Sequence, residues 1–331
     1  MQTHRRRRRR RSWSRTLLLL IFVAAGVIGV VKCLVHAPSL TDPEAGGSSS
    51  AAASSSQGGA SSSEEDPPSG QERKKQFYTI LLSGRDDDNG GSDTNILVAF
   101  DAAGGAVNCV SIPRDTGAYV NGKVHKINLA SKTSTQKLAD TVSDLLGIPV
   151  DFTIEVNLQG FEDLVNAIGG VDFNVPINMN YDDPTQDLHI HLSAGMQHLY
   201  GADALGVVRF RHNNDGTGYG TEDIGRIGTQ QAFLKAVAQQ TLTLSNADKI
   251  PELAKLFQTY VTTRLSAGEL AWFGTKALSI GTDNIRFTTL PGVWSDRRKL
   301  WVVDADQTLE LVNTQLNPYM EDRSPDALHI P

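Results

Sequence analysis

Apolar positions follow two alternating patterns from residue 77 to residue 331. Short runs rich in apolar and β-branched residues are typical of strands, and longer runs with apolar residues at i, i+3, i+4 and i+7 indicate amphipathic helices. Their alternation predicts an α/β fold in which helices cover both faces of a mixed sheet. The predicted strands span residues 77–83, 95–101, 106–112, 151–156, 171–175, 188–192, 207–210 and 285–289. The predicted helices span residues 133–146, 158–168, 202–205, 221–242, 249–260, 267–280 and 305–316.

The N-terminal part has a different pattern. A run of arginines, Arg5 to Arg11, precedes an uncharged apolar stretch from Leu17 to Val31. The next four residues extend this stretch to about the twenty that cross a bilayer. We predict a transmembrane helix over residues 16–36, with the basic residues 1–15 in the cytoplasm and the rest of the chain outside. A cleaved signal peptide is the alternative, but no small-x-small cleavage site follows the apolar stretch.

Residues 37–75 separate the predicted helix from the α/β region. Serine, glycine, alanine, proline and acidic residues dominate this segment, so it cannot bury enough apolar surface to fold. We predict a disordered tether with an end-to-end distance of roughly 35 Å. The strands and helices that follow are not interrupted by a second linker, and residues 76–331 are therefore predicted to form one domain.

Charge is distributed unevenly along the chain. Residues 1–36 hold nine basic residues and no acidic ones, whereas the whole chain has a net charge of -6 and residues 76–331 have a net charge of -12. The arginine run directly precedes the predicted membrane span, so we assign it to membrane topology. The acidic surface of residues 76–331 does not attract nucleic acid, and we expect no nucleic-acid partner. The two cysteines cannot form a disulfide framework for an exported domain. Cys109, in an apolar run, is expected to be buried.

Two acidic residues flank a short loop that contains Gly90 and Gly91. Asp86 follows the predicted strand 77–83, and Asp93 precedes the predicted strand 95–101. Carboxylates brought together across such a loop form an oxygen-rich site suited to Mg²⁺. Acid-rich glycine loops are also common as solvated turns.

Arginines lie at the ends of predicted strands. Arg114 follows the strand 106–112, at the edge of the sheet where open α/β proteins bind ligands. Arg209 and Arg211 alternate along the predicted strand 207–210, which would point both side chains to one side of the sheet. A cationic face of this kind suits phosphate groups better than a core.

A third set of polar residues shares one face of the predicted helix 221–242. Asp223, Arg226 and Gln230 are spaced i, i+3 and i+7, and the amides at the start of the helix would add partial positive charge beside Arg226. A surface ion pair between Asp223 and Arg226 is the plainer alternative. Fork-shaped guanidinium donors combined with Mg²⁺ form a site suited to a diphosphate.

Other catalytic signatures are absent from the sequence. The chain has no GxSxG, Walker A or HExxH motif. His189 and His191 alternate along the predicted strand 188–192 and could both ligate a metal. A third ligand with fitting spacing is not evident in the sequence, and paired surface histidines are the more common arrangement.

The motifs together resemble the LytR-CpsA-Psr family over residues 77–240. The resemblance rests on the order of the following segments: Tyr78 to Asp86, Ser92-Asp93-Thr94, Ser111 to Asp115, Lys126-Ile127-Asn128, Val208 to Arg211, and Asp223 to Ile227 with Gln230. Intermediate stretches agree as well, namely Leu146 to Pro149, Gly169 to Val171 and Tyr181 to Asp183.

The resemblance implies a three-layer α/β/α domain with an apolar groove for a polyprenyl chain. Family members attach wall teichoic acid or capsular polysaccharide from an undecaprenyl diphosphate carrier to peptidoglycan. The resemblance further implies that Asp86 and Asp93 hold Mg²⁺. It implies that Arg114 acts with Arg226 in catalysis, and that Asp223 orients Arg226 or takes a proton from the acceptor hydroxyl. The residues that it places on the diphosphate are Arg85, Arg114, Arg209, Arg211, Arg226 and Gln230.

The chain departs from the family pattern at Gly91, where an arginine is usual, and Arg85 on the same loop is the candidate to replace that arginine. Two other functions remain open at this stage. A diphosphatase acting on the same lipid-linked glycan would use the same residues with water as acceptor. A non-enzymatic membrane-bound regulator is the second, although a DNA-binding module would require a folded cytoplasmic part.

Overall fold

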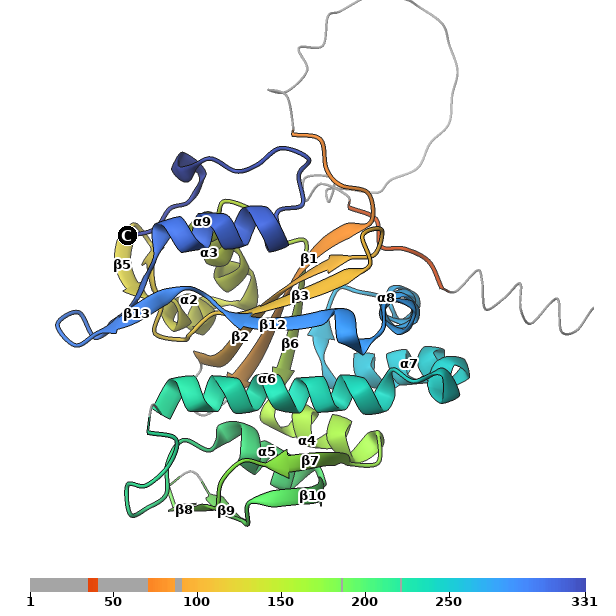
Figure 1. Ribbon diagram of the computed structural model, residues 1–331, viewed down its shortest axis with the longest axis vertical. Coiled ribbons are helices and arrows are strands. Elements are labelled where there is room, and N and C mark those ends of the chain that lie inside the picture. Colours follow the sequence, from red (N-terminus) through yellow and green to blue (C-terminus); the bar gives the residue numbers. More distant parts are fainter. Residues whose placement is uncertain (1–34, 41–70, 87–90, 186, 221) are drawn as a thin grey trace, which may run out of the picture.

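The computed structural model describes residues 35–40, 71–86, 91–185, 187–220 and 222–331. A mixed six-stranded sheet forms its centre (Figure 1), and its strands are β1 (Phe77–Asp86), β2 (Gly91–Asp101), β3 (Ala106–Ser111), β6 (Phe152–Asn157), β11 (Thr262–Thr263) and β12 (Ile285–Thr289). The strand order is β11-β6-β1-β2-β3-β12. β1 runs antiparallel to β2 and parallel to β6, and β12 runs parallel to β3. The predicted mixed sheet is confirmed.

Helices cover both faces of this sheet. Adjacent residues of a strand point to opposite faces, so Leu81 packs with one helical layer and Ile80 with the other. The first layer is formed by α2 (Asn128–Thr133), α3 (Thr135–Leu146) and α9 (Ala305–Leu311). The second is formed by α8 (Ala267–Ile280) with parts of α6 (Glu222–Thr241) and α7 (Ile250–Tyr260).

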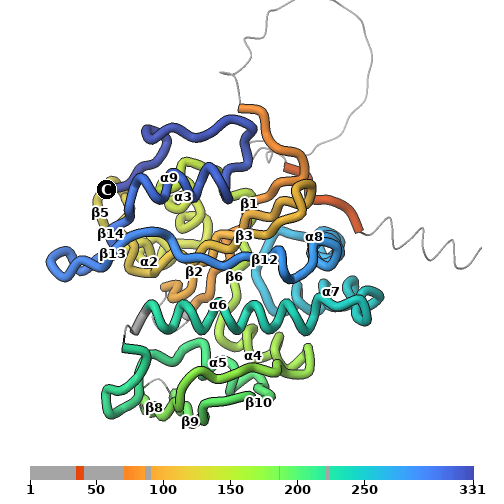
Figure 2. Tube along the Cα trace, viewed as in Figure 1, coloured from red at the N-terminus to blue at the C-terminus, as the bar shows by residue number. Residues whose placement is uncertain are grey.

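A further layer lies beyond α6, on the side away from the sheet (Figures 1 and 2). It has its own core, in which Val165, Phe173 and Val207 pack against Phe233 of α6. Its elements are α4 (Leu158–Ala167), α5 (Gly201–Arg209), β7 (Val171–Val175), β8 (Met179–Asp183), β9 (Leu188–Leu192) and β10 (Gly195–Leu199). β7 pairs with β10, and β8 pairs with β9, as two antiparallel hairpins.

The predicted strand 207–210 is wrong. These residues form the end of α5, and Phe210 is its C-terminal cap residue. Val207 and Phe210 are both buried, and their separation of three residues fits one face of a helix. Short apolar runs do not distinguish strand from helix by periodicity alone, which explains the error. The alternation of side chains along a strand therefore does not determine which way Arg209 and Arg211 point.

Two smaller hairpins complete the domain. They are formed by β4 (Gly117–Val120) with β5 (Lys123–Lys126), and by β13 (Gly292–Ser295) with β14 (Leu300–Val303). Cys109 is buried in the central sheet as predicted, and burial raises the pKa of its thiol to about 12. This cysteine is therefore an inert part of the core.

The N-terminal boundary of the folded part differs from the predicted one. Arg73, within the predicted tether, donates to both carboxylate oxygens of Asp151, at 2.9 and 2.8 Å. Pro38 is buried, and its carbonyl accepts a hydrogen bond from the hydroxyl of Tyr78. Figure 2 shows this short segment, residues 35–40, beside α8. Both ends of the predicted tether thus contact the domain.

Residues 16–34 of the predicted transmembrane helix and residues 41–70 of the tether lie outside the described residues, whereas Val35 and His36, at the end of the predicted helix, are described and are not helical. Among the helices of the described part of the chain, none is both long and apolar enough to cross a membrane.

We expect Arg73→Ala to lower the free energy of unfolding by about 3 kcal/mol, because the carboxylate of Asp151 would stay buried without its cation. The side chain of Asp151 is only 5% exposed. Urea unfolding of the purified protein measures the change. Lys299→Ala is the matched control, since the Lys299–Asp296 pair is largely exposed to solvent and contributes little to stability. Equal stabilities of the two variants would contradict the assignment.

His198 on β10 gives the fold a pH-dependent contact. Its Nδ1 lies 2.6 Å from Asp172 Oδ1 and its Nε2 lies 2.9 Å from the carbonyl oxygen of Gly169, so both nitrogens face acceptors. The hydrogen bond to Asp172, followed by the one to Gly169, raises the pKa of His198 above its usual value. The stabilisation is therefore complete below the unfolded-state pKa of about 6.5 and is lost as the pH rises through the higher folded-state pKa.

We expect the melting temperature of the wild type to fall more between about pH 5.5 and about pH 8.5 than that of His198→Gln. Thermal unfolding at both pH values tests this. Identical pH dependence in the two proteins would show that His198 titrates equally in the folded and unfolded states.

Candidate active site

A cavity of about 740 Å³ lies between the central sheet and helices α4 to α8. Most of its wall is apolar and comes from β1, β6 and these five helices. Representative wall residues are Ile80, Leu82, Val156, Phe161, Leu164, Phe233, Val237, Leu253, Phe257 and Phe273. The apolar faces of these helices thus line a cavity in addition to filling the core, which periodicity alone did not reveal.

Charged side chains gather at one part of the cavity wall. The described lining residues include five arginines and a single carboxylate, that of Asp93. Such an excess of fixed positive charge beside an apolar surface suits an amphiphile with an anionic head group. The arginines are Arg85, Arg114, Arg209, Arg211 and Arg226.

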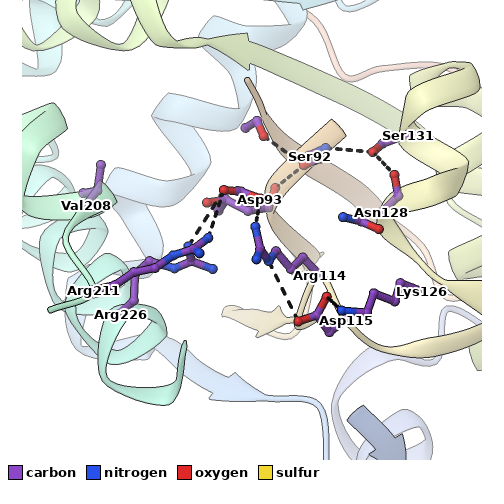
Figure 3. Close-up of polar contacts among 12 residues, drawn as sticks. Ser92, Asp93, Arg114, Asp115, Lys126, Asn128, Ser131, Val208, Arg211 and Arg226 are labelled. Carbon is purple, nitrogen blue, oxygen red and sulfur yellow. Dashed lines mark hydrogen bonds and ion pairs between the residues drawn. The ribbon is translucent and has the colours of Figure 1, made fainter. Parts of the chain in front are cut away.

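Asp93 is the centre of this group (Figure 3). Its Oδ1 accepts a hydrogen bond of 2.7 Å from Arg114, and its Oδ2 lies 3.3 Å from Arg211 and 3.8 Å from Arg226. The three arginines come from different parts of the chain: the segment after β3, the segment after α5, and α6 itself. The structure therefore brings together residues that are more than a hundred positions apart in the sequence.

The strand that carries Asp93 is irregular at this point. In the pairing of β1 with β2, Gly84 is opposite Thr94 and Arg85 is opposite Ser92, so Asp93 has no partner. An extra residue of this kind redirects a side chain and is common beside active sites. The preceding Ser92 is buried, and its amide donates to Ser131 Oγ at 2.8 Å. A side chain of α2 thus holds the bulge in place.

Burial works to raise the pKa of the Asp93 carboxyl. The hydrogen bond and charge of Arg114, with the charges of Arg226 and Arg211, more than offset burial and leave the pKa below its usual value. Asp93 consequently remains ionised and is a poor general base. It is suited to holding guanidinium groups or a cation.

A second carboxylate supports Arg114 from the other side. Asp115 lies 4.0 Å from Arg114 Nε and accepts from Lys126 Nζ at 2.8 Å, as Figure 3 shows. The sequence analysis assigned no role to Asp115 or Lys126, although both belong to the motifs that carry the family resemblance. The chain Lys126–Asp115–Arg114–Asp93 fixes the guanidinium at the cavity wall.

Two other predicted residues line the cavity with partners of their own. Arg85 lies 3.5 Å from Glu155 of β6. Gln230 donates from Nε2 to the carbonyl of Val208 at 2.9 Å and so ties α6 to the end of α5, next to Arg209. Gln230 therefore also positions the segment that carries Arg209 and Arg211.

The position of Gly91 bears on the departure from the family pattern. A side chain at this position would lie 3.5 Å from the Cε atom of Lys132 on α2. A cation from another element thus lies beside the place of the usual arginine, while Arg85 faces Glu155.

The side chains of Asp86 and Asp223 lie outside the described part of the structure. The backbone of Asp86 is opposite Gly91, two residues from Asp93, so the two acids come from adjacent strands. Asp223 lies in the first turn of α6, the helix that carries Arg226. The predicted roles of Asp86 and Asp223 stay predictions.

The fold is of the α/β class, and its cavity joins an apolar wall to a cluster of arginines. A model of the LytR_cpsA_psr family matches residues 46–317, and the chain belongs to this family.

Two relatives and one solved structure show the extent of the similarity. The polyisoprenyl-teichoic acid–peptidoglycan teichoic acid transferase TagV of Bacillus subtilis (strain 168) is 33% identical over 184 residues, which cover 54% of this chain and 46% of the relative. The cell wall biosynthesis protein LcpA of Corynebacterium glutamicum is 31% identical over 231 residues, which cover 60% of this chain and 43% of the relative. The crystal structure of B. subtilis TagV matches with a TM-score of 0.63 and 27% identity, over 75% of this chain and 100% of that chain. The matched regions thus span less than half the length of the two relatives.

Proposed function

We propose that this protein is a membrane-anchored phosphotransferase. It moves a glycan phosphate from a polyprenyl diphosphate carrier, of the undecaprenyl type, onto peptidoglycan, and thereby attaches a teichoic acid or capsular polysaccharide outside the cell. The observation that carries the proposal is the cavity, in which an extended apolar wall adjoins five arginines. The names of the transferase relatives point to the same class of reaction.

The apolar wall would hold the polyprenyl chain. Each buried methylene contributes about 0.8 kcal/mol, so a long chain supplies most of the binding energy. Binding energy from this remote part of the substrate positions the diphosphate at the arginines.

The arginines would act on the transferring group. Before the substrate binds, Asp115 holds the guanidinium group of Arg114 in place. Burial does the same for the guanidinium group of Arg226. Preorganised donors of this kind stabilise the negative charge that develops on the transferring phosphoryl group and on the departing polyprenyl phosphate. The acceptor is a hydroxyl of peptidoglycan, and Asp223 is the candidate to take its proton.

The ionised carboxylate of Asp93 supports a Mg²⁺ site at the cavity wall. A carboxylate, a second carboxylate from the adjacent strand and the oxygens of a diphosphate are ligands that Mg²⁺ prefers. We infer that Asp93 and Asp86 would hold the ion. When bound, it would neutralise charge on the diphosphate.

The test uses the full-length protein in detergent with a radiolabelled polyprenyl-diphosphate oligosaccharide, peptidoglycan fragments and Mg²⁺. Label on peptidoglycan that depends on Mg²⁺ is expected. If free phosphorylated sugar is released, with or without the acceptor, the protein is a diphosphatase and not a transferase. Bound but unchanged substrate would overturn the enzymatic proposal in favour of a carrier or regulator.

A further inference from the structure

The hairpin of β8 and β9 carries a cluster of polar side chains away from the arginine site. Asp182 on β8 is directly opposite His189 on β9, and Asn180 is directly opposite His191. Because side chains alternate along a strand, all four lie on one face of the hairpin. The other face packs into the protein, where Met179 and Ile190 are buried.

Three of these side chains converge on one point. His189 Nδ1 lies 2.5 Å and His191 Nε2 lies 3.2 Å from the same oxygen, Asp182 Oδ1. Within the described part of the chain, Asp182, His189 and His191 are the only three His, Cys, Asp or Glu residues whose ligand atoms all lie within 4.8 Å of one another. The sequence showed the two histidines but not the third ligand, which the hairpin register supplies.

We propose that Asp182, His189 and His191 form a binding site for a transition-metal ion of the zinc class. Two imidazoles and one carboxylate are a ligand set used for such ions. With metal–ligand bonds of about 2.0–2.2 Å, tetrahedral ligand atoms lie about 3.4 Å apart. The His191–Asp182 distance is already close to this value, and the His189–Asp182 distance has to open by about 1 Å, which half-exposed side chains allow.

The surroundings orient the ligands as metal sites require. His191 Nδ1 lies 2.7 Å from Asn180 Oδ1, which makes Nδ1 the protonated nitrogen and leaves the Nε2 lone pair directed at Asp182. Fixing the tautomer of a ligating histidine through its other nitrogen is the usual arrangement in metal sites.

Two asparagine side chains of a loop hold the backbone of β8 in place. The amides of Asn180 and Asp182 donate to Asn213 Oδ1 and Asn214 Oδ1, both at 2.6 Å. The site is thus built on a rigid hairpin.

The site also has a link to the cavity. Tyr181 and Leu188, on the inner face of the same hairpin, line the cavity wall. Asn213 and Asn214 follow Arg211 in the chain by two and three residues. A bound ion would therefore clamp the hairpin that forms one side of the cavity, while its remaining coordination positions face solvent.

The chain contains its own matched control. His198 and Asp172 form a similar exposed His–Asp pair, 2.6 Å apart, on the neighbouring hairpin of β7 and β10. This second pair belongs to no group of three ligands among the described residues. A simple surface contact would behave alike at both places, whereas a metal site exists only at the first.

The experiment titrates Zn²⁺ into the metal-stripped full-length protein, purified without a histidine tag and held in excess Mg²⁺, with calorimetry as the readout. Imidazole ligands select Zn²⁺ over Mg²⁺, so the excess Mg²⁺ masks the separate site at Asp93. We expect one Zn²⁺ per chain, and an absorption spectrum of tetrahedral Co²⁺ when Co²⁺ replaces it. His198→Gln should bind Zn²⁺ as the wild type does.

Asn180→Ala should weaken binding by about 10- to 100-fold, as loss of an outer-shell partner does, and His191→Gln by more than about 100-fold. Asp182→Asn, which preserves shape and removes the charge, should match His191→Gln. Circular dichroism confirms that the variants are folded. Absence of stoichiometric Zn²⁺ binding in the wild type, or equal affinity in His191→Gln and His198→Gln, would overturn the proposal.

Discussion

Arg226→Ala is expected to reduce turnover of the lipid-linked donor by about 10³-fold or more, the range found when an arginine that stabilises a transferring phosphoryl group is removed. The Arg226 side chain is only 4% exposed and projects from α6 to within 3.8 Å of Asp93. It is the most buried of the three arginines around that carboxylate. Single-turnover transfer of the labelled glycan measures the loss.

Arg226→Lys separates charge from geometry, because lysine keeps the charge but lacks the fork of donors. Its rate should lie between those of the wild type and Arg226→Ala. Arg286→Ala, at an exposed position of β12 outside the cavity, is the control and should keep full activity. Normal turnover in Arg226→Ala, with Arg286→Ala equally active, would remove Arg226 from the site.

Ala238→Trp should reduce kcat/KM for a long polyprenyl donor by roughly 100-fold while leaving a short-chain donor almost unaffected. Ala238 lies on α6 and lines the cavity, so a tryptophan there takes space that the chain would occupy. Each methylene kept out of the cavity loses about 0.8 kcal/mol, or about fourfold in affinity. Four methylenes are thus enough for the expected effect.

The control for this change is Ala232→Trp, on the exposed face of the same helix. It tests whether tryptophan on α6 disturbs the protein without entering the cavity, and it should have wild-type kinetics with both donors. Equal losses for long and short donors in Ala238→Trp would mean that the cavity does not hold the polyprenyl chain.

The sequence predicted which charged residues meet at the cavity better than it predicted the elements that carry them. Arg114 was predicted because it follows a strand at the ligand-binding edge of the sheet. Asp93 was predicted because it flanks a short acidic loop, and Arg226 because it shares one helix face with Asp223 and Gln230. Arg209 and Arg211 also reach the cavity, but through the end of α5 and not through a strand. The error arose because a run of four residues is too short to show its period.

The hairpins were the least predictable elements. β5 is exposed and charged, and β4 has only four residues, so neither has the longer apolar run on which the strand assignments depended. One local signal was present and was not used. Asn121 and Gly122 connect the two strands with positive φ angles of 53° and 77°, which is the Asn-Gly turn favoured between paired strands.

Asp182 shows a different limit. It lies seven positions before His189 in the chain, and only the register of β8 with β9 places the two side by side. A one-residue shift of this register would turn Asp182 to the other face. Ligands that depend on strand register cannot be found from spacing alone.

The contacts at both ends of residues 41–70 change how far the domain can travel from the bilayer. Val35 packs with Ile250, Ala254 and Leu270, which also line the cavity, and Arg73 is bound to Asp151. A segment fastened to the same body at both ends adds no reach, however long it is. If the apolar stretch before Val35 spans the membrane, the domain therefore stands directly on its anchor, with the apolar part of the cavity next to the bilayer. A polyprenyl chain could then pass from membrane to protein without crossing water.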